Sequence, residues 1–197
     1  MNELSYLNIR KPCASDVANL AVFVKALQDE YAEMERAGGV NAEVNYTYFQ
    51  IPGSSDLAKY YNRLNRLGEW VNHVNGSPWK AIYLVVDPTK EEEVFGIFSI
   101  IEDFNDDDYR SDGAIALCVS PAHRCKGIGR YIMNYCRGYF GEMGRKSFEV
   151  ACDECDVLVK VFLESFESIT LKGGYKVGPY EMLRYTVDSN CNRNSFR

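Results

Sequence analysis

The sequence lacks any apolar run that approaches the ~18 residues needed by a membrane-spanning helix. Residues 1–5 also lack the basic and then apolar order of a secretory signal, so we expect a cytoplasmic protein without a membrane partner. Positive charge is not in excess either. The formal net charge of -6 at pH 7 argues against a nucleic-acid-binding module.

The sequence has only two histidines in 197 residues, His73 and His123. The seven cysteines are an odd number without a secretory signal, which argues against a disulfide framework. Cys152 and Cys155 form one C-x-x-C pair, which could serve redox chemistry or half of a zinc site. No second pair and no nearby histidine completes such a site, so we expect reduced thiols and no metal.

The remaining composition is that of an ordinary globular protein. Hydrophobic residues make up 46% and charged residues 25% of the chain, as is typical of soluble domains. A length of 197 residues suits one domain with a sizeable core. We expect that domain to span residues 1–188, and residues 189–197 to form a polar C-terminal tail.

One stretch in the middle of the chain combines a strand pattern, a glycine loop and a helix pattern. Residues 114–119 form an apolar run, and the chain then bends at Ser120 and Pro121. A loop with Gly127 and Gly129 follows. Residues 128–140 place apolar and aromatic side chains at the spacing of one buried helix face. The stretch therefore predicts a strand, a glycine loop and a helix.

This arrangement suits an anion. The start of a helix gathers free backbone N–H groups and the positive end of the helix dipole, and glycines allow close approach. The region is also basic within an acidic protein, with Glu142 as its one acid; its basic residues are Arg124, Lys126, Arg130, Arg137, Arg145 and Lys146. A local basic patch of this kind favours a phosphate-bearing ligand.

Two common phosphate loops are excluded by the spacing. A P-loop has Gly-Lys followed by Ser or Thr, whereas here Lys126 precedes Gly127 and Ile128 follows it. A dinucleotide fingerprint needs a third glycine, and Ile132 stands at that position. A tight structural turn remains an alternative for a glycine pair after a strand.

The pattern Arg124-x-x-Gly127-x-Gly129, behind a strand that reads Leu-Cys-Val-Ser-Pro, resembles the acetyl-CoA loop of the GNAT superfamily, the Gcn5-related N-acetyltransferases. The resemblance implies that the coenzyme pyrophosphate lies on backbone N–H groups, with Arg124 and Lys126 adding charge. It also implies that the strand pairs with the pantetheine arm through its backbone. The implied coenzyme-binding residues are Leu117, Cys118, Val119, Arg124, Cys125, Lys126, Gly127, Ile128, Gly129 and Arg130.

The rest of the chain fits the element order of that family. Periodicity and turn residues predict strands at 6–10, 79–86, 94–101, 114–119, 147–152, 175–177 and 182–187, and helices from 17 up to the glycines at 38–39 and at 57–74, 128–140 and 157–171, with a loop at 40–53. The resemblance implies an α/β GNAT fold in a single domain. Its central twisted sheet would be mixed and mostly antiparallel, with about seven strands and helices on both faces.

The implied reaction is direct transfer of acetyl from acetyl-CoA to a primary amine in a ternary complex. A carboxylate is useful there, because the attacking amine must lose a proton. Family members often carry a glutamate where this chain has Gly113, so the neighbouring Asp112 is the candidate base, and Glu102 or Asp103 is the alternative. Asp-Gly could also be only a turn.

The family's proton donor to the coenzyme thiolate is a tyrosine four residues before the glycine that follows the last long helix. Counting back from Gly174 gives Thr170, whose hydroxyl is a poor acid and could at most orient a water or donate to sulfur. Tyr175, Tyr180 or solvent could supply the proton instead.

Two further positions depart from the family pattern, since Leu163 and Phe166 replace its asparagine and alanine. The alternative function is therefore a GNAT-fold, coenzyme-A-binding regulatory protein with weak or no transferase activity. Cys152 has no histidine to activate it, so we expect a core residue and not a nucleophile.

The resemblance places the acceptor beside the first two helices and the last hairpin. Tyrosines and acids gather in those segments: Tyr31, Tyr46, Tyr48, Tyr60, Tyr61 and Tyr180, with Glu30, Glu33 and Glu35. Aromatic faces and carboxylates suit a cationic amine, either a small molecule or an amine on a protein. The tyrosines could instead pack the core. A homodimer is compatible with this reading.

Overall fold

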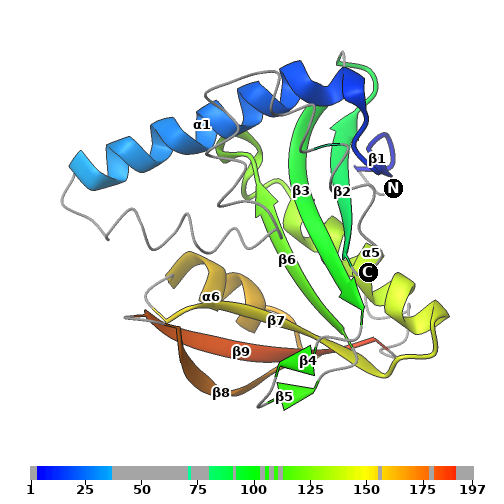
Figure 1. Cartoon of the computed structure of the whole chain (residues 1–197), viewed down its shortest axis with the longest axis vertical. Helices are drawn as coiled ribbons and strands as arrows, with labels where there is room; N and C mark the ends of the chain where they lie inside the picture. The colour runs from blue at the N-terminus through cyan, green and yellow to red at the C-terminus, as the bar shows by residue number, and fades with distance from the viewer. Residues whose placement is uncertain are drawn as a thin grey trace. The chain divides into compact units, whose positions relative to one another are not determined.

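The computed structural model describes residues 4–36, 71, 80–90, 92–102, 105–106, 109–110, 113–154, 157–177 and 180–189. Its strands are β1 (Asn8–Arg10), β2 (Lys80–Asp87), β3 (Glu93–Glu102), β4 (Asn105–Asp106), β5 (Tyr109–Arg110), β6 (Gly113–Val119), β7 (Ser147–Asp153), β8 (Ile169–Val177) and β9 (Tyr180–Asp188). Its helices are η1 (Ala14–Asp16), α1 (Val17–Arg36), η2 (Pro121–His123), α5 (Ile128–Glu142) and α6 (Val157–Glu164), and Figure 1 labels the strands and the α-helices.

The larger sheet has seven strands in the order β1-β2-β3-β6-β7-β9-β8, and β4 pairs with β5 in a separate hairpin. β6 and β7 run parallel, whereas β1–β2, β7–β9 and β8–β9 are antiparallel pairs. The mixed, mostly antiparallel sheet of about seven strands is therefore confirmed. Among the described residues, no helix is both long and apolar enough to cross a bilayer.

The chain divides into two compact units, residues 1–99 with 116–132 and residues 100–115 with 133–197. The first unit holds β1, α1, β2, most of β3, the end of β6, η2 and the first turn of α5. The second unit holds the start of β6, the rest of α5, β7, α6, β8 and β9. Three elements continue from one unit into the other.

The core of the first unit lies between α1 and the sheet. Leu20, Phe23, Val24 and Leu27 recur at helical spacing, so they form one apolar face of α1. This face joins a buried cluster with residues of β2, β3 and β6: Ile82, Leu84, Val86, Val94, Ile97 and Cys118. Each fully buried large apolar side chain contributes roughly 1.5–3 kcal/mol, so this contact fixes α1 on the sheet. Figure 1 shows α1 lying against these strands.

An arginine ties the start of the chain to the turn between β2 and β3. The guanidinium of Arg10 donates to both carboxylate oxygens of Asp16, at 2.8 and 2.7 Å, and to Glu92 Oε2 at 2.8 Å. Asp16 is buried, and the N–H of Cys13 also donates to it, at 2.7 Å. Burial alone would raise the pKa of Asp16, but these hydrogen bonds from Arg10 and Cys13 hold the pKa below its ordinary value.

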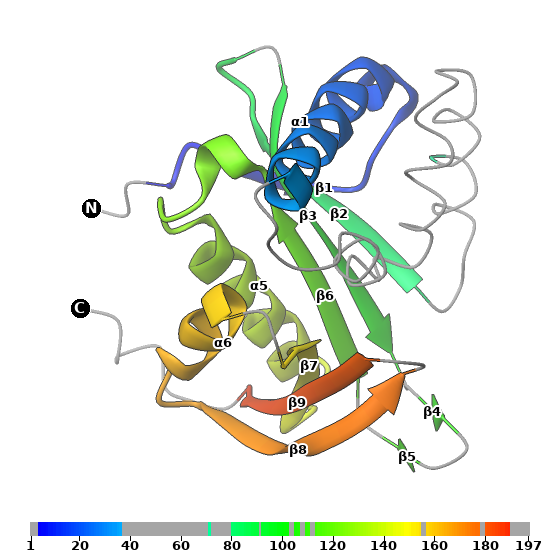
Figure 2. The ribbon, with the colours of Figure 1, turned by 90° about the vertical axis from the view of Figure 1, so that its left-hand side faces the viewer.

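In the second unit, β7 lies between β6 and β9. It pairs with β9 from Ser147↔Asp188 to Asp153↔Met182, and with β6 at Ala114↔Glu149 and Ile115↔Val150. β8 and β9 form a long hairpin with a register shift between Leu171 and Gly173. Figure 2 shows β7, β9 and β8 side by side. Leu163 and Phe166, at and just after the end of α6, are buried.

The prediction of a helix over 157–171 was wrong at its C-terminal end. α6 ends at Glu164, and residues 169–177 form β8, of which the predicted strand at 175–177 is the last part. The apolar residues Phe162, Phe166 and Ile169 fit a helical period, but Ile169 and Leu171 also fit the alternation of a strand. Pairing with β9 along the whole of β8 decides between the two, which is a tertiary effect.

The other predicted elements agree with the structure to within a few residues, apart from the β4–β5 hairpin, which was not predicted. The strand expected at 6–10 begins at Asn8 as β1, and the helix expected from 17 up to the glycines at 38–39 ends at Arg36. The loop at 40–53 lies outside the described residues. So does the helix at 57–74 except Val71, which is helical and buried.

Candidate functional site

The predicted order of strand, glycine loop and helix is confirmed for β6, the loop and α5. Backbone hydrogen bonds fix both ends of the loop. The N–H of Ser120 donates to the carbonyl of Phe95 at 2.9 Å, and the N–H of His123 donates back to Ser120 at 2.8 Å. At the other end, the N–H of Tyr131 donates to the carbonyl of Gly127 at 2.9 Å. Residues 124–127 therefore bridge two anchored ends.

The backbone of this loop alternates between negative and positive φ angles, as many anion-binding loops do. Cys125 and Gly127 have positive φ angles of 57° and 84°, and Lys126 lies between them. Alternating handedness turns successive N–H groups toward one concave side, which binds anions. The first turn of α5 continues the loop, and N–H groups there have no acceptor earlier in the helix. Cys125, Lys126 and Gly127 are all exposed, so an anion can reach them.

Arg124, the first residue of the motif, is held by two other parts of the first unit. Its Nη1 donates to Glu30 Oε1 at 2.6 Å, and its Nε donates to the carbonyl of Val119 at 3.2 Å. Glu30 lies on α1 and was expected on the acceptor side. Lys126 donates to the carbonyl of Ala122 at 2.7 Å and stays exposed.

His123, the residue before Arg124, connects the start of the loop to β3. Its ring stacks on Phe95, and its Nε2 lies 2.9 Å from Glu93 Oε1. The Lys90 ammonium lies 5.6 Å from the centre of the Phe95 ring. Sequence reasoning missed this role of His123, because no pattern in the sequence links it to residues some thirty positions earlier.

All ten predicted coenzyme-binding residues lie in the first unit, within residues 116–132. The structure therefore brings the end of β6, the loop and the start of α5 together. Cys118 is buried in the core of this unit, and burial raises the pKa of its thiol. Leu117 and Val119 are half-buried.

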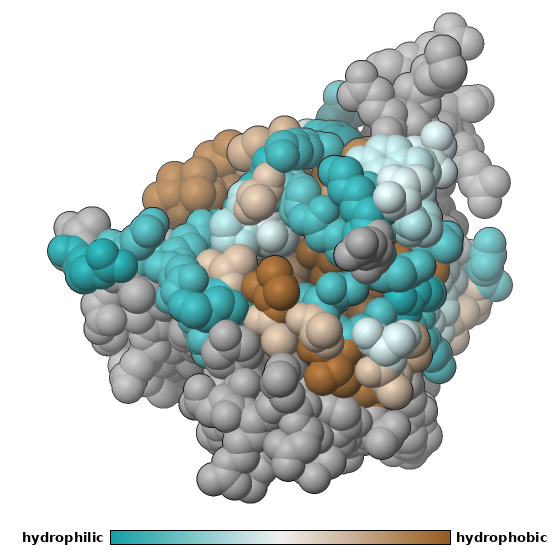
Figure 3. All heavy atoms as spheres, turned by 90° about the horizontal axis from the view of Figure 1, so that it is seen from above, coloured by the Kyte–Doolittle hydropathy of each residue, from teal (hydrophilic) through white to brown (hydrophobic). Residues whose placement is uncertain are grey.

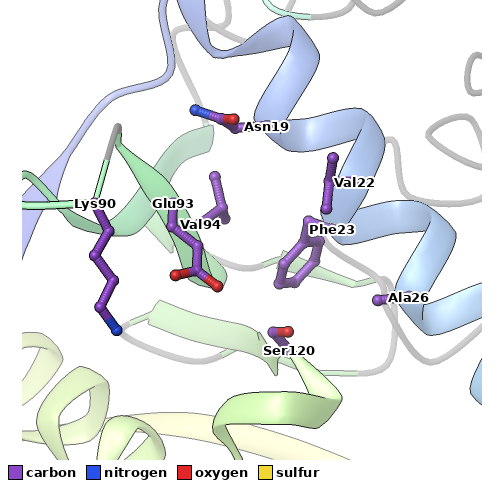
Figure 4. Close-up of a pocket in the computed structure, with 8 residues that line it drawn as sticks. All are labelled: Asn19, Val22, Phe23, Ala26, Lys90, Glu93, Val94 and Ser120. Carbon is purple, nitrogen blue, oxygen red and sulfur yellow. The ribbon is translucent and has the colours of Figure 1, made fainter.

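A pocket of about 280 Å³ lies beside the start of this loop. One wall is the α1 side chains Val22, Phe23 and Ala26, and Figure 4 shows Glu93 opposite them with Lys90 and Ser120 nearby. Asn19 and Val94 complete the lining. Seen from above in Figure 3, hydrophobic groups lie among hydrophilic ones over the described surface. Val22 is 69% exposed, so this wall is open to solvent.

The predicted base Asp112 and the alternative Asp103 lie outside the described residues. The structure does explain why Gly113 carries no side chain. An added Cβ there would lie 2.3 Å from Phe140 Cε1 and 3.0 Å from the carbonyl oxygen of Ile101, so a glutamate cannot fit. Glu102, the other alternative, is half-buried at the end of β3, and the hydroxyl of Tyr139 donates to its carboxylate.

The choice of Thr170 as a proton donor rested on a helix that continues to residue 171, and that helix is not there. Thr170 is exposed on β8, where it pairs with Thr186. The count from Gly174 therefore no longer relates Thr170 to the end of a helix. Tyr175, one alternative donor, is 42% exposed, and the guanidinium of Arg184 lies 5.8 Å from its ring centre.

The sequence did not indicate a role for Tyr185, which is a buried residue of β9. Its hydroxyl donates to Glu164 Oε1 at 3.2 Å. Burial, with Cys152 and Glu164 nearby, raises the pKa of Tyr185 to about 12. Cys152 is buried, as expected of a core residue, and Cys155 lies outside the described part of the chain. Among the described residues, no group of three or more His, Cys, Asp or Glu side chains is arranged to hold a metal.

The predicted acceptor side is described only in part. Tyr46, Tyr48, Tyr60 and Tyr61 lie outside the described residues, and the side chains of Tyr31, Glu35 and Tyr180 lie outside them too. Glu33 is exposed near the end of α1.

Comparison with known proteins adds sequence and fold relationships. The sequence model of the acetyltransferase (GNAT) family matches residues 55–161, and the comparison with curated proteins gave no match. The fold is similar to spermidine N-acetyltransferase from Vibrio cholerae in complex with CoA and spermine, with a TM-score of 0.60 and 16% identity over 94% of this chain and 96% of that one.

Two other solved structures are also similar. Ribosomal-protein-S5-alanine acetyltransferase from Vibrio fischeri has a TM-score of 0.61 and 13% identity over 94% of each chain. The microcin C7 self-immunity acetyltransferase, in complex with acetyl-CoA and AMP, has a TM-score of 0.65 and 12% identity over 93% of each chain. These identities show a shared fold. Because the family model spans more than half of the chain, and carries the loop built above, the chain belongs to the acetyltransferase (GNAT) family and is an acyltransferase.

Proposed function

We propose that the protein transfers an acetyl group from acetyl-CoA to a primary amine while both substrates are bound. One observation carries this proposal: the exposed loop at Cys125–Lys126–Gly127, with its two left-handed residues, leads directly into the first turn of α5. Such a site fits a diphosphate, because it offers several N–H donors and a positive helix end together. Acetyl-CoA supplies the activated thioester, and the proposed chemistry uses no metal.

Each part of the loop has a separate task in binding. The N–H groups of residues 125–130 hold the diphosphate, and the exposed Lys126 and Arg130 side chains add positive charge. The backbone of Leu117, Cys118 and Val119 lies alongside the pantetheine arm as an added strand would. A fixed backbone N–H of this segment can polarise the thioester carbonyl and stabilise the negative charge on its oxygen.

A carboxylate takes the proton that the attacking amine must lose. The amine nitrogen forms a bond to the carbonyl carbon, the carbon–sulfur bond breaks, and the thiolate is protonated from solvent. Asp112 and Glu102 are the candidate bases. Glu102 is half-buried and accepts a hydrogen bond from Tyr139, so its carboxylate is held in one place. Gly113 and Phe140 leave no room for a base on β6 itself at that position.

The acceptor is a small cationic amine or an amine on a protein. The net charge of -6 favours cations near the protein surface. The similar structures cover both acceptor types, because one is named for spermidine and another for an alanine of ribosomal protein S5. The exposed Glu33 near the end of α1 suits an ammonium group.

One observation favours a second function, a coenzyme-A-binding regulatory protein with weak or no transfer. The space at Gly113, where related enzymes often place a glutamate, is filled by the Phe140 ring. The binding loop is intact under either function. Turnover, and not coenzyme binding, therefore distinguishes the two.

The test combines coenzyme binding with turnover. Acetyl-CoA at 100 times its dissociation constant should stabilise the native state by about 2.7 kcal/mol, which a thermal melt detects. Free thiol release is then followed with spermidine, an amino sugar, a lysine peptide and a peptide with an N-terminal alanine. Thiol release with one class of amine supports the enzyme and names its acceptor. A thermal shift without turnover supports the regulatory function, and no thermal shift contradicts both.

The same assay identifies the base. Asp112→Asn and Glu102→Gln each remove one candidate carboxylate while keeping the size of the side chain. General bases typically accelerate the reaction by ~10²–10⁴-fold. The variant that lacks the true base should therefore lose kcat by about that factor and keep its affinity for acetyl-CoA. Equal, small losses in both variants would contradict both assignments.

A further inference from the structure

The ion pair between Arg124 and Glu30 joins residues 124–127, here called the coenzyme loop, to α1. The two side chains are 36% and 28% exposed, so the pair is partly shielded from water. Its N–O distance of 2.6 Å lies at the short end for a charge-assisted hydrogen bond. The same guanidinium also donates to the carbonyl of Val119, so one side chain connects the end of β6, the loop and the helix.

Glu30 lies on the part of α1 that packs into the core. It follows the buried Leu27 by three residues, so the two lie on neighbouring positions of the same helix face. Leu27 and Val24 belong to the buried cluster that also contains Cys118 of β6. The helix segment that carries Glu30 is therefore packed against the strand that leads into the loop.

The start of the loop is held at two points by adjacent residues. His123 fastens it to β3 through Phe95 and Glu93, and Arg124 fastens it to α1. The exposed part of the loop begins at the next residue, Cys125, with a positive φ of 57°. A shift of Arg124 would therefore also move Cys125 and the backbone N–H groups that follow it.

If Glu30 acted only through its negative charge, it would weaken the binding of acetyl-CoA. A carboxylate near a diphosphate site weakens anion binding, so its removal should tighten the binding of acetyl-CoA. A carboxylate that orients the loop should instead be needed for tight binding. The direction of the change therefore separates the two roles.

We propose that Glu30 is a positioning residue for the coenzyme loop and acts through Arg124. Its carboxylate holds the guanidinium against the carbonyl of Val119, and this contact fixes the direction in which the loop leaves η2. The diphosphate is then bound by the backbone N–H groups, Lys126 and Arg130, while Arg124 serves the shape of the loop. This inference rests on the proposed function, because its ligand is acetyl-CoA.

The test measures the dissociation constant of acetyl-CoA by calorimetry for the wild type, Glu30→Ala and Glu30→Gln. We expect Glu30→Ala to weaken binding about tenfold, equivalent to ~1.4 kcal/mol. Glu30→Gln should lose less, because its amide oxygen still accepts from Arg124. The KM for acetyl-CoA should rise in both, with little change in kcat at saturating coenzyme, since the reacting groups are untouched.

Asp29→Asn is the matched control. Asp29 is the preceding residue on α1, its side chain is 58% exposed, and it pairs with Lys25 on the same helix. Its replacement changes the net charge by the same amount without touching the loop. We expect its dissociation constant to stay within about twofold of the wild-type value, since surface pairs contribute little.

A double-mutant cycle tests whether Glu30 acts through Arg124. If it does, Glu30→Ala should add almost nothing to the loss already caused by Arg124→Met. Unchanged or tighter binding by Glu30→Ala and Glu30→Gln would overturn the inference, and so would additive losses in the double variant. If the wild type itself does not bind acetyl-CoA, the proposed function fails and this inference fails with it. If Glu30→Ala does not fold, Glu30→Gln and Arg124→Met still decide the question.

Discussion

The imidazole of His123 lies flat against the ring of Phe95, with the ring centroids 3.7 Å apart and the planes inclined by 11°. His123 also reaches Glu93 on the same strand, at 2.9 Å from Nε2 to Oε1. A stacked aromatic pair of this kind is worth ~0.5–1.5 kcal/mol beyond the area that it buries. The start of the coenzyme loop thus depends on an aromatic contact as well as on backbone hydrogen bonds.

Replacement of His123 should separate the stacking from the hydrogen bond. His123→Ala removes both, and we expect it to lower the free energy of unfolding by about 1–3 kcal/mol. His123→Phe keeps a ring on Phe95, and Glu93, with 45% of its side chain exposed, can be solvated by water. We therefore expect most of the stability to return in His123→Phe. Urea unfolding measures both variants, and equal losses would show that the hydrogen bond dominates.

Gly127 should not tolerate a side chain. Its φ of +84° is a left-handed conformation, which costs roughly 1–2 kcal/mol for other residues. An added Cβ would also lie 3.3 Å from Leu4 Cδ1. We expect Gly127→Ala to shift the loop and to reduce the acetyl-CoA-induced rise of the melting temperature by more than half. A variant that is destabilised but binds acetyl-CoA normally would contradict this role of the loop.

Gly113→Ala should destabilise the protein because of a steric clash. Its Cβ would lie 2.3 Å from Phe140 Cε1, and overpacking of a core costs typically ~1–3 kcal/mol. Gly138→Ala is the control, since Gly138 lies in α5 and an added Cβ there meets no atom within 4 Å. We expect Gly138→Ala to stabilise the protein by up to ~1 kcal/mol, through helix propensity. Denaturant unfolding of both variants should show changes of opposite sign.

The contribution of Asp16 to stability should depend on pH. Because its pKa in the folded protein lies below the ordinary value of 3.8, folding favours the ionised carboxylate. This contribution is present above the unfolded pKa and is lost as the pH falls through the folded pKa. Arg10→Gln removes the partner, so wild type and variant should differ most at neutral pH and converge in acid.

Urea unfolding between about pH 7 and pH 3 measures this convergence, since carboxylates in this range become protonated. Lys25→Gln, at the exposed pair with Asp29, is the control and should have little effect at any pH. A constant difference between wild type and Arg10→Gln across the range would mean that Asp16 is not the group involved.

The cysteines should differ sharply in reactivity. Cys118 and Cys136 are buried, and burial raises the pKa of each thiol, so neither should react in the native state. Cys13 and Cys125 are exposed and should react quickly. Acetyl-CoA should slow the labelling of Cys125 and leave Cys13 unchanged. Peptide mapping after short labelling measures this, and equal protection of both would argue against coenzyme binding at the loop.

The sequence was sufficient to predict β6, the loop and α5, because the strand pattern, the glycines and the helical period are all local and adjacent. It failed at the end of α6, where Ile169 and Leu171 fit both periods and β9 decides the outcome. The same limit applies to side-chain pairing. Glu30 and Arg124 are 94 residues apart, so nothing local shows that this acid belongs to the coenzyme loop.

The ring that fills the space beside Gly113 also limits how this sequence can change. Phe140 packs against Phe148, with ring centroids 4.7 Å apart, so it cannot easily turn aside for a new side chain. A carboxylate at position 113 becomes possible only after residue 140 has become smaller, and that first step leaves a cavity in the core. The two positions are therefore epistatic: a carboxylate at position 113 alone, or a smaller residue at position 140 alone, makes the protein less stable than both the present pair and the double change.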